Sequence, residues 1–183
     1  MIIEQKPKYV NMTDVISQNA PASPASLAVE PAYELIEFLF FAYRDFVQEA
    51  DAALARYGFG RAHHRVLHFV FRNPDLKVAE LLDILKITKQ SLGRVLRDLV
   101  EQGFVEAAEG KTDRRQRLLR ATPKGEALAL ELSRLQTRRL QTALEAAGPG
   151  AEEVALTFLK AMVNSHERGE VERLVRSAQP TVK

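Results

Sequence analysis

The stretch from Lys77 to Thr122 constrains the fold most, because two helical patterns and two strand-like runs follow one another there without a gap. Four apolar residues recur at helical spacing in its first part: Val78, Leu81, Leu82 and Leu85. After a break at Lys86 and Ile87, Thr88 is suited to cap a second helix, since its hydroxyl can accept from the free N–H groups of the first turn. Such a short connection predicts a helix–turn–helix that exposes one face of its second helix.

The second helix has one apolar and one polar face. The stripe predicted to be buried comprises Leu92, Val95, Leu96, Leu99 and Val100. Gly103 supplies the left-handed residue that ends the helix. The polar face carries hydrogen-bond donors, small residues and cations, namely Thr88, Lys89, Gln90, Ser91, Gly93, Arg94 and Arg97. Because Arg can form two hydrogen bonds with a guanine edge and Gln with an adenine edge, this face predicts readout of a DNA major groove.

Two short strands are expected next, around a polar tip. Phe104, Val105 and Ala107 suggest the first strand, and Leu118 and Leu119 the second. Between them, the segment EGKTDRRQR carries four basic residues: Lys111, Arg114, Arg115 and Arg117. A basic hairpin beside a helix–turn–helix is a wing, and wing arginines can enter a minor groove.

The charge of the chain is concentrated in this stretch. Between residues 88 and 124 there are nine basic and five acidic side chains, whereas the whole chain has a net charge of only +2. The rest of the chain is therefore slightly acidic, and the positive charge lies where contact with nucleic acid would need it.

These motifs together resemble the MarR family of winged-helix transcriptional regulators. The resemblance rests on ITKQSLGRVLRDLVEQGFV, on DRRQR in the hairpin and on ATPKG after it. The positions characteristic of the family are occupied by Arg94, Gly103, Asp113, Arg115, Thr122 and Gly125, whereas Ala121 stands where Leu is usual. The resemblance implies a triangular homodimer with interlocked first and last helices. It also implies that Asp113 orients the wing arginines and that Arg115 contacts DNA.

The fold class expected from these patterns is mainly α with a small β-hairpin wing, in which a winged helix–turn–helix is flanked by terminal dimerisation helices. Residues 31–60 and 123–176 form the expected helical dimerisation region, and residues 61–122 the DNA-binding domain. Residues 1–30, rich in Ala, Pro and Ser, are interpreted as a flexible tail. Alternatively they form an arm packed on a partner subunit. Residues 177–183 are a second tail.

The helices outside the central stretch carry more apolar surface than a small winged helix can cover. The first, from Pro31 to about Tyr57, has a wide apolar face that includes Phe38, Leu39, Phe40 and Phe41. A short helix over 61–73 directs Val66, Leu67, Val70 and Phe71 inward. A long helix runs from Pro123 to about Ala147, and a single last helix runs from Val154 toward Leu174. The excess apolar surface predicts a homodimer.

Composition narrows the remaining possibilities. The chain has no Cys, which excludes disulfides, thiol nucleophiles and the thiol-based peroxide sensing known in the family. No apolar run approaches the roughly 20 residues that span a bilayer, and the first residues lack the apolar core of a signal peptide. We therefore expect a cytoplasmic protein without membrane contact.

A histidine cluster supports the alternative of a metal-binding or enzymatic protein. His63, His64 and His68 are close in sequence, and His64 and His68 share a helix face at a spacing that can bind a metal. However, no acidic residue lies between them, and the chain shows no nucleophile–base constellation and no Gly-rich phosphate loop. We therefore expect neither an enzyme nor a cofactor.

A ligand pocket is the other expectation for this region. Its candidate lining residues are Tyr43, Arg44, Phe46, His63 and His64. An Arg and imidazoles over an aromatic floor suit a carboxylate. The resemblance implies relief by small aromatic or anionic effectors bound between the dimer helices and the winged helix. The resulting prediction is a dimeric regulator that reads an inverted-repeat operator on double-stranded DNA.

Overall fold

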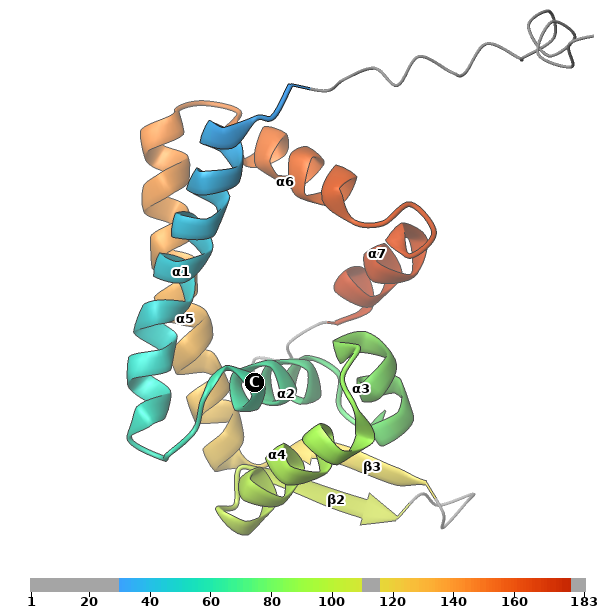
Figure 1. Cartoon of the computed structure of the whole chain (residues 1–183). Helices are drawn as coiled ribbons and strands as arrows, with labels where there is room; N and C mark the ends of the chain where they lie inside the picture. The colour runs from blue at the N-terminus through green and yellow to red at the C-terminus, as the bar shows by residue number, and fades with distance from the viewer. Residues whose placement is uncertain (1–29, 110–115, 179–183) are drawn as a thin grey trace, which may run out of the picture. The chain divides into compact units, whose positions relative to one another are not determined.

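The computed structural model describes residues 30–109 and 116–178. The tail or arm at 1–29, the wing tip with Lys111, Asp113, Arg114 and Arg115, and the last five residues lie outside the described residues. Along the chain the elements are α1 (Tyr33–Ala55), α2 (Arg61–Arg72), β1 (Leu76–Lys77), α3 (Val78–Leu85), α4 (Lys89–Glu101), β2 (Val105–Glu109), β3 (Arg117–Ala121), α5 (Pro123–Ala147), α6 (Ala151–Met162) and α7 (Arg168–Ser177) (Figure 1). The expected fold class, mainly α with a small β-wing, is confirmed.

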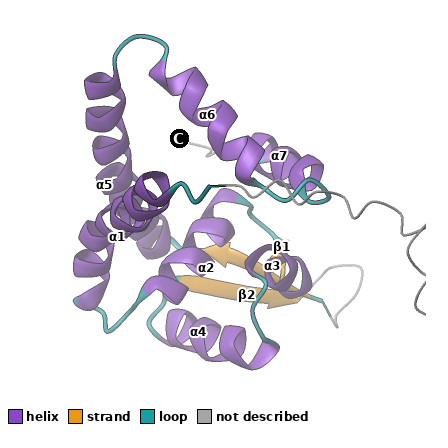
Figure 2. Cartoon of the chain, turned by 45° about the horizontal axis from the view of Figure 1, so that its top comes forward, coloured by secondary structure: helices purple, strands orange, loops and turns teal. Residues whose placement is uncertain are grey.

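A helix–turn–helix and a small antiparallel sheet form the centre of the fold. The helix α2 packs on α3, α4, α5 and β3, and α4 lies alongside β2 (Figure 2). The strand order is β1-β3-β2, with Leu76 opposite Leu119 and Val105 opposite Ala121. The sequence did not predict β1, because a strand of two residues is too short to show alternation.

One apolar core joins these elements. Its fully buried residues come from every element between α1 and α5 except β1: Ala50, Leu54, Val66, Leu67, Val70, Leu81, Leu92, Leu99, Phe104, Val105, Leu119 and Leu132. The predicted stripe of α4 is confirmed for Leu92, Val95 and Leu99, and Leu96 is partly buried. Burial of Val100 was a wrong prediction, since this side chain is 41% exposed. Val100 lies about 80° round the helix from Leu92 and so falls at the edge of the stripe.

The start of α5 locks onto the end of α4. The Thr122 hydroxyl accepts from the backbone N–H of Gly125 at 3.1 Å and donates to the Gly103 carbonyl at 2.7 Å. The Thr122 N–H donates to the Phe104 carbonyl at 3.1 Å. Gly103 has a φ of +74°, as the helix-ending role predicted for it requires. The ATPKG motif is therefore a structural joint between the wing and the long helix.

The C-terminal helix predicted as one element is two, α6 and α7. Val163 is extended, and the Asn164 carbonyl accepts from the N–H groups of Glu167 and Arg168 to form a turn. The Arg168 guanidinium donates to the carbonyls of Ala161 and Val163 and so satisfies the end of α6. Apolar residues continue at helical spacing through α7, which is why the sequence pattern concealed this break.

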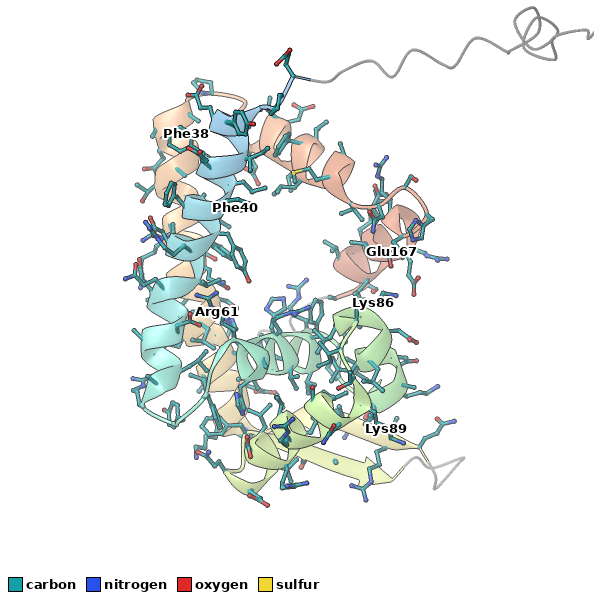
Figure 3. All side chains as sticks on the ribbon, viewed as in Figure 1. Phe38, Phe40, Arg61, Lys86, Lys89 and Glu167 are labelled. Atoms are coloured by element: carbon teal, nitrogen blue, oxygen red, sulfur yellow. The ribbon has the colours of Figure 1, made fainter. Side chains whose placement is uncertain are left out.

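Large apolar side chains remain exposed on α1 and α6. On α1 they include Phe38, Leu39, Phe40 and Phe41, of which Phe38 and Phe40 are labelled in Figure 3. On α6 they are Val154, Leu156, Phe158, Leu159 and Met162, and no residue of this helix is buried. Among the described residues, no helix is long and apolar enough to cross a membrane.

Candidate DNA-binding site and adjacent pocket

The start of α4 is built as the sequence predicted. The Thr88 hydroxyl accepts from the Ser91 N–H at 3.2 Å and donates to the Ser91 hydroxyl at 2.9 Å. Only Lys86 and Ile87 separate Thr88 from the end of α3, and Lys86 adopts the left-handed conformation with φ of +51°. This turn fixes the direction in which α4 leaves α3.

The polar face of α4 is exposed in the described part of the chain. All seven of its predicted residues are exposed: Thr88, Lys89, Gln90, Ser91, Gly93, Arg94 and Arg97. Within the described residues, no carboxylate pairs with Lys89, Arg94 or Arg97. Apart from the adjoining backbone of α4, no atom of the described residues lies within 4 Å of the position that a Cβ at Gly93 would occupy. Unneutralised cations on a convex helix face suit the phosphates and base edges of a duplex.

His63 on α2 holds α4 in place through a hydrogen bond to Asp98. The ring of His63 stacks on Phe59, and its Nδ1 accepts from the Gly60 N–H at 3.2 Å. This leaves the Nε2–H to donate to the Asp98 carboxylate on α4 at 3.0 Å. The sequence had suggested His63 as a pocket residue, and no sequence signal linked it to Asp98, which lies 35 residues away.

The base of the wing is held by an ion pair. The Arg120 guanidinium binds both oxygens of Asp75, with N–O distances of 2.6 and 2.7 Å. Asp75 has a φ of +66°, and its N–H donates to the Leu119 carbonyl. One of the nine basic residues counted in the sequence is therefore neutralised within the fold, whereas Arg117 on the same strand is exposed. The other predicted wing residues lie outside the described part.

A pocket lies between α1, α2 and α5, with a volume of about 310 Å³. Its lining residues are Tyr43, Phe46, Val47, Arg61, His64, Arg65, His68, Phe69 and Gln136. It brings together three of the five ligand residues suggested by the sequence, Tyr43, Phe46 and His64. The other two lie elsewhere, since His63 faces Asp98 and Arg44 pairs with Asp45 in a separate hollow of about 420 Å³. Sequence reasoning missed Arg61 and Arg65, although they lie on the same helix face as His64 and His68.

Burial controls the charge of the pocket histidines. It lowers the pKa of His64, which nearby Asp51 partly opposes. It also lowers the pKa of His68, and the neighbouring His64 and Arg72 act in the same direction. Both imidazoles are therefore neutral at pH 7. Among the described residues there is no group of three or more His, Asp or Glu side chains that could hold a metal ion.

Acidification should destabilise the protein through these two histidines. The unfolded chain takes up protons below about pH 6.5, whereas the lowered pKa values keep both side chains neutral in the fold. The contribution of the two histidines to the free energy of unfolding is therefore fully present above about pH 6.5. It is lost as the pH drops toward the folded-state pKa values, by at most about 1.4 kcal/mol per pH unit for each histidine. Denaturant titrations between pH 7.5 and 5.5 should show this fall. A His64→Gln/His68→Gln variant should flatten it, with the exposed His166→Gln as a control; an unchanged slope in the double variant would contradict the assignment.

Comparison with known proteins identifies the family. A model of the MarR family matches residues 57–116. The HTH-type transcriptional regulator PetP of Rhodobacter capsulatus is 46% identical over 129 residues, which are 70% of this chain and 78% of PetP. The apo form of wild-type MarR from E. coli is 23% identical and superposes with a TM-score of 0.55, over 74% of this chain and 99% of MarR. The repressor CouR, solved with a 23-mer DNA duplex, is 22% identical with a TM-score of 0.60, over 79% of this chain and 100% of CouR.

The winged helix with an exposed basic α4 thus agrees in fold with these structures, and the identity to PetP extends over most of both chains. The chain belongs to the MarR family of DNA-binding transcriptional regulators.

Proposed function

We propose that the protein acts as a homodimer on an inverted-repeat operator, with α4 of each protomer in a major groove and each wing over a minor groove. The observation that carries this proposal is the exposed basic face of α4, whose cations pair with no carboxylate in the described ranges 30–109 and 116–178. The solved complex of CouR with a DNA duplex supports it, since CouR shares the fold. Residues 61–122 form the DNA-binding domain in this proposal, and residues 31–60 and 123–176 the dimerisation region.

The contacts are divided between helix and wing. On α4, the DNA-binding residues are Thr88, Lys89, Gln90, Ser91, Arg94 and Arg97. On the wing they are Lys111, Arg114, Arg115 and Arg117, with Asp113 orienting the arginines. Side chains that hydrogen-bond to base edges specify sequence, whereas phosphate contacts set position and salt dependence.

The spacing of the two half-sites follows from the dimer. Two-fold symmetry turns a pair of recognition helices into readers of two equivalent half-sites. Successive major grooves on one face of B-DNA lie about 34 Å apart, so the half-site centres should be about 10 base pairs apart. The exposed apolar surfaces of α1 and α6 are the proposed two-fold interface.

We further propose that a small aromatic carboxylate in the pocket relieves DNA binding. The volume of about 310 Å³ lies at the lower end of the range of small-molecule sites. Tyr43, Phe46 and Phe69 supply aromatic surface, and Arg61 and Arg65 supply cationic donors. A carboxylate on a ring matches this combination.

Selection of bound fragments from random and genomic DNA tests the operator proposal. The selected fragments should share an imperfect inverted repeat with the spacing given above. The affinity of the full-length protein for that repeat should fall steeply with salt concentration, as counterion release requires. Fragments without a shared repeat, or an affinity independent of salt, would refute sequence-specific binding through α4.

Replacing Arg94 by Ala should weaken binding to the selected operator by about 1–3 kcal/mol, because a bidentate contact to a base is lost. Binding to random duplex should change much less. The control is Arg134→Ala, which removes the same charge from an exposed position on α5. Fluorescence anisotropy at one fixed salt concentration measures both affinities. Equal losses on operator and random DNA would make Arg94 a phosphate contact.

A further inference from the structure

We infer that Arg65 couples the pocket to the recognition helix: a carboxylate bound in the pocket draws the Arg65 guanidinium from the end of α3 and loosens the turn that positions α4. This inference rests on the proposed pocket ligand and adds the route by which its binding reaches DNA.

The Arg65 side chain belongs both to the pocket and to the end of α3. It lines the pocket on α2, and its Nη2 donates to the backbone carbonyl of Leu85 at 3.2 Å, 20 residues further along the chain. Leu85 is the last residue of α3, so its carbonyl belongs to the group that has no partner within the helix. An Arg side chain satisfies such a carbonyl and is favoured at the negative end of the helix.

The turn beyond Leu85 is sensitive to this contact. Lys86 holds a left-handed conformation that a residue with a Cβ rarely adopts, and such a conformation persists only when its surroundings fix it. The Lys86 Nζ lies 3.3 Å from Oε1 of Glu167, the residue that precedes α7 in the chain (Figure 3). Thr88, the N-cap of α4, follows two residues later. The connection from Leu85 to α4 is short and its conformation is fixed, so a displacement of the Leu85 carbonyl also moves the start of α4.

Arg65 is also the guanidinium in the pocket best placed to take a carboxylate. Arg61 is already engaged, since its Nε pairs with Asp51 at 2.8 Å. Within the described part of the chain, Arg65 has no carboxylate partner, and its side chain is exposed. A carboxylate carries the opposite charge and can take two parallel hydrogen bonds from a guanidinium, whereas the neutral Leu85 carbonyl takes one from Arg65. A bound acid thus competes with Leu85 for Arg65.

The test compares wild-type protein with Arg65→Gln and with the control Arg134→Gln, using benzoate as the probe. Isothermal titration measures benzoate binding, anisotropy measures affinity for the selected operator with and without benzoate, and amide exchange follows residues 86–91. For wild type, we expect saturating benzoate to weaken operator binding by about 5- to 150-fold and to speed amide exchange over 86–91. Without benzoate, Arg65→Gln should already show weakened binding and faster exchange, and benzoate should add little. With and without benzoate, Arg134→Gln should match wild type in both readouts, because Arg134 is exposed on α5 and does not line the pocket.

The outcomes separate the coupling from the pocket itself. Wild-type protein that fails to bind benzoate would refute the pocket as a carboxylate site, and the coupling with it. Two results would overturn the coupling alone. In the first, Arg65→Gln binds benzoate and loses as much operator affinity on binding it as wild type does. In the second, the amides of 86–91 exchange in Arg65→Gln at the wild-type rate. Circular dichroism checks that Arg65→Gln folds, and Arg65→Lys, which keeps the charge but not the planar fork, replaces it for the same comparison if it does not.

Discussion

Replacing Phe158 by Asp is expected to leave a folded monomer whose operator affinity is about 100- to 10,000-fold weaker. The helix α6 has no buried residue, yet Val154, Phe158, Leu159 and Met162 are large and exposed. An apolar surface of this kind marks a protein interface, and a charge at its centre is costly to bury. A monomer binds one half-site only and therefore loses the gain that comes from linking two. Sedimentation equilibrium measures the mass, and anisotropy measures the affinity for the full repeat.

The same charge at a neighbouring position provides the control. Thr157 is exposed on α6 and lies in the polar sector of the helix, about 100° from Phe158. Thr157→Asp should remain dimeric and bind the operator like wild type. A Phe158→Asp protein that is monomeric yet binds the full repeat as tightly as wild type would refute the dimer and the proposed spacing of half-sites together.

The helix–turn–helix was predictable because its determinants are local. Thr88 caps the helix with its own hydroxyl, Gly103 ends it with a left-handed backbone, and the apolar spacing of Leu92, Val95 and Leu99 defines the buried face. Each of these signals acts within one or two helical turns, so a single sequence displays them. The start of α5 at Pro123 and its end before Gly148 were predictable for the same reason.

What the sequence missed depends on contacts between distant residues. The pairing of His63 with Asp98 and that of Arg120 with Asp75 join segments 35 and 45 residues apart. Nothing in the spacing of these residues indicates such pairs. The break between α6 and α7 depends on Arg168 reaching back to the end of α6. The pocket was predictable only in part. The sequence indicated His64 on α2 and Tyr43 and Phe46 on α1, whereas Val47 on α1 and Gln136 on α5 line it without any sequence signal.

Replacing Gly125 by Ala should destabilise the protein by about 3 kcal/mol or more, at the upper end of what overpacking usually costs. A Cβ at this position would overlap the backbone carbonyl oxygen of Phe104 and lie 2.9 Å from its carbon. That carbonyl cannot retreat easily, because the Phe104 ring is fully buried between Tyr57 and Phe59, at centroid distances of 5.0 and 5.2 Å. The Phe104 N–H is also bonded to the Leu99 carbonyl at 2.8 Å. At about 2–4 °C per kcal/mol for a chain of this size, the melting temperature should fall by about 6–12 °C.

Gly93 offers a matched control on α4. It is exposed in a helix interior, and beyond the neighbouring backbone of α4 none of the atoms in the described part of the chain comes within 4 Å of the position that a Cβ would occupy. Gly93→Ala should therefore stabilise the fold by about 0.5–1 kcal/mol, since Ala restricts the unfolded chain more than Gly does. Calorimetry at one fixed protomer concentration compares the two variants, because the stability of a dimer depends on concentration. If Gly125→Ala melted at the wild-type temperature, Phe104 would have to yield to the new methyl group, and the joint between wing and α5 would not be the reason for glycine in the ATPKG motif.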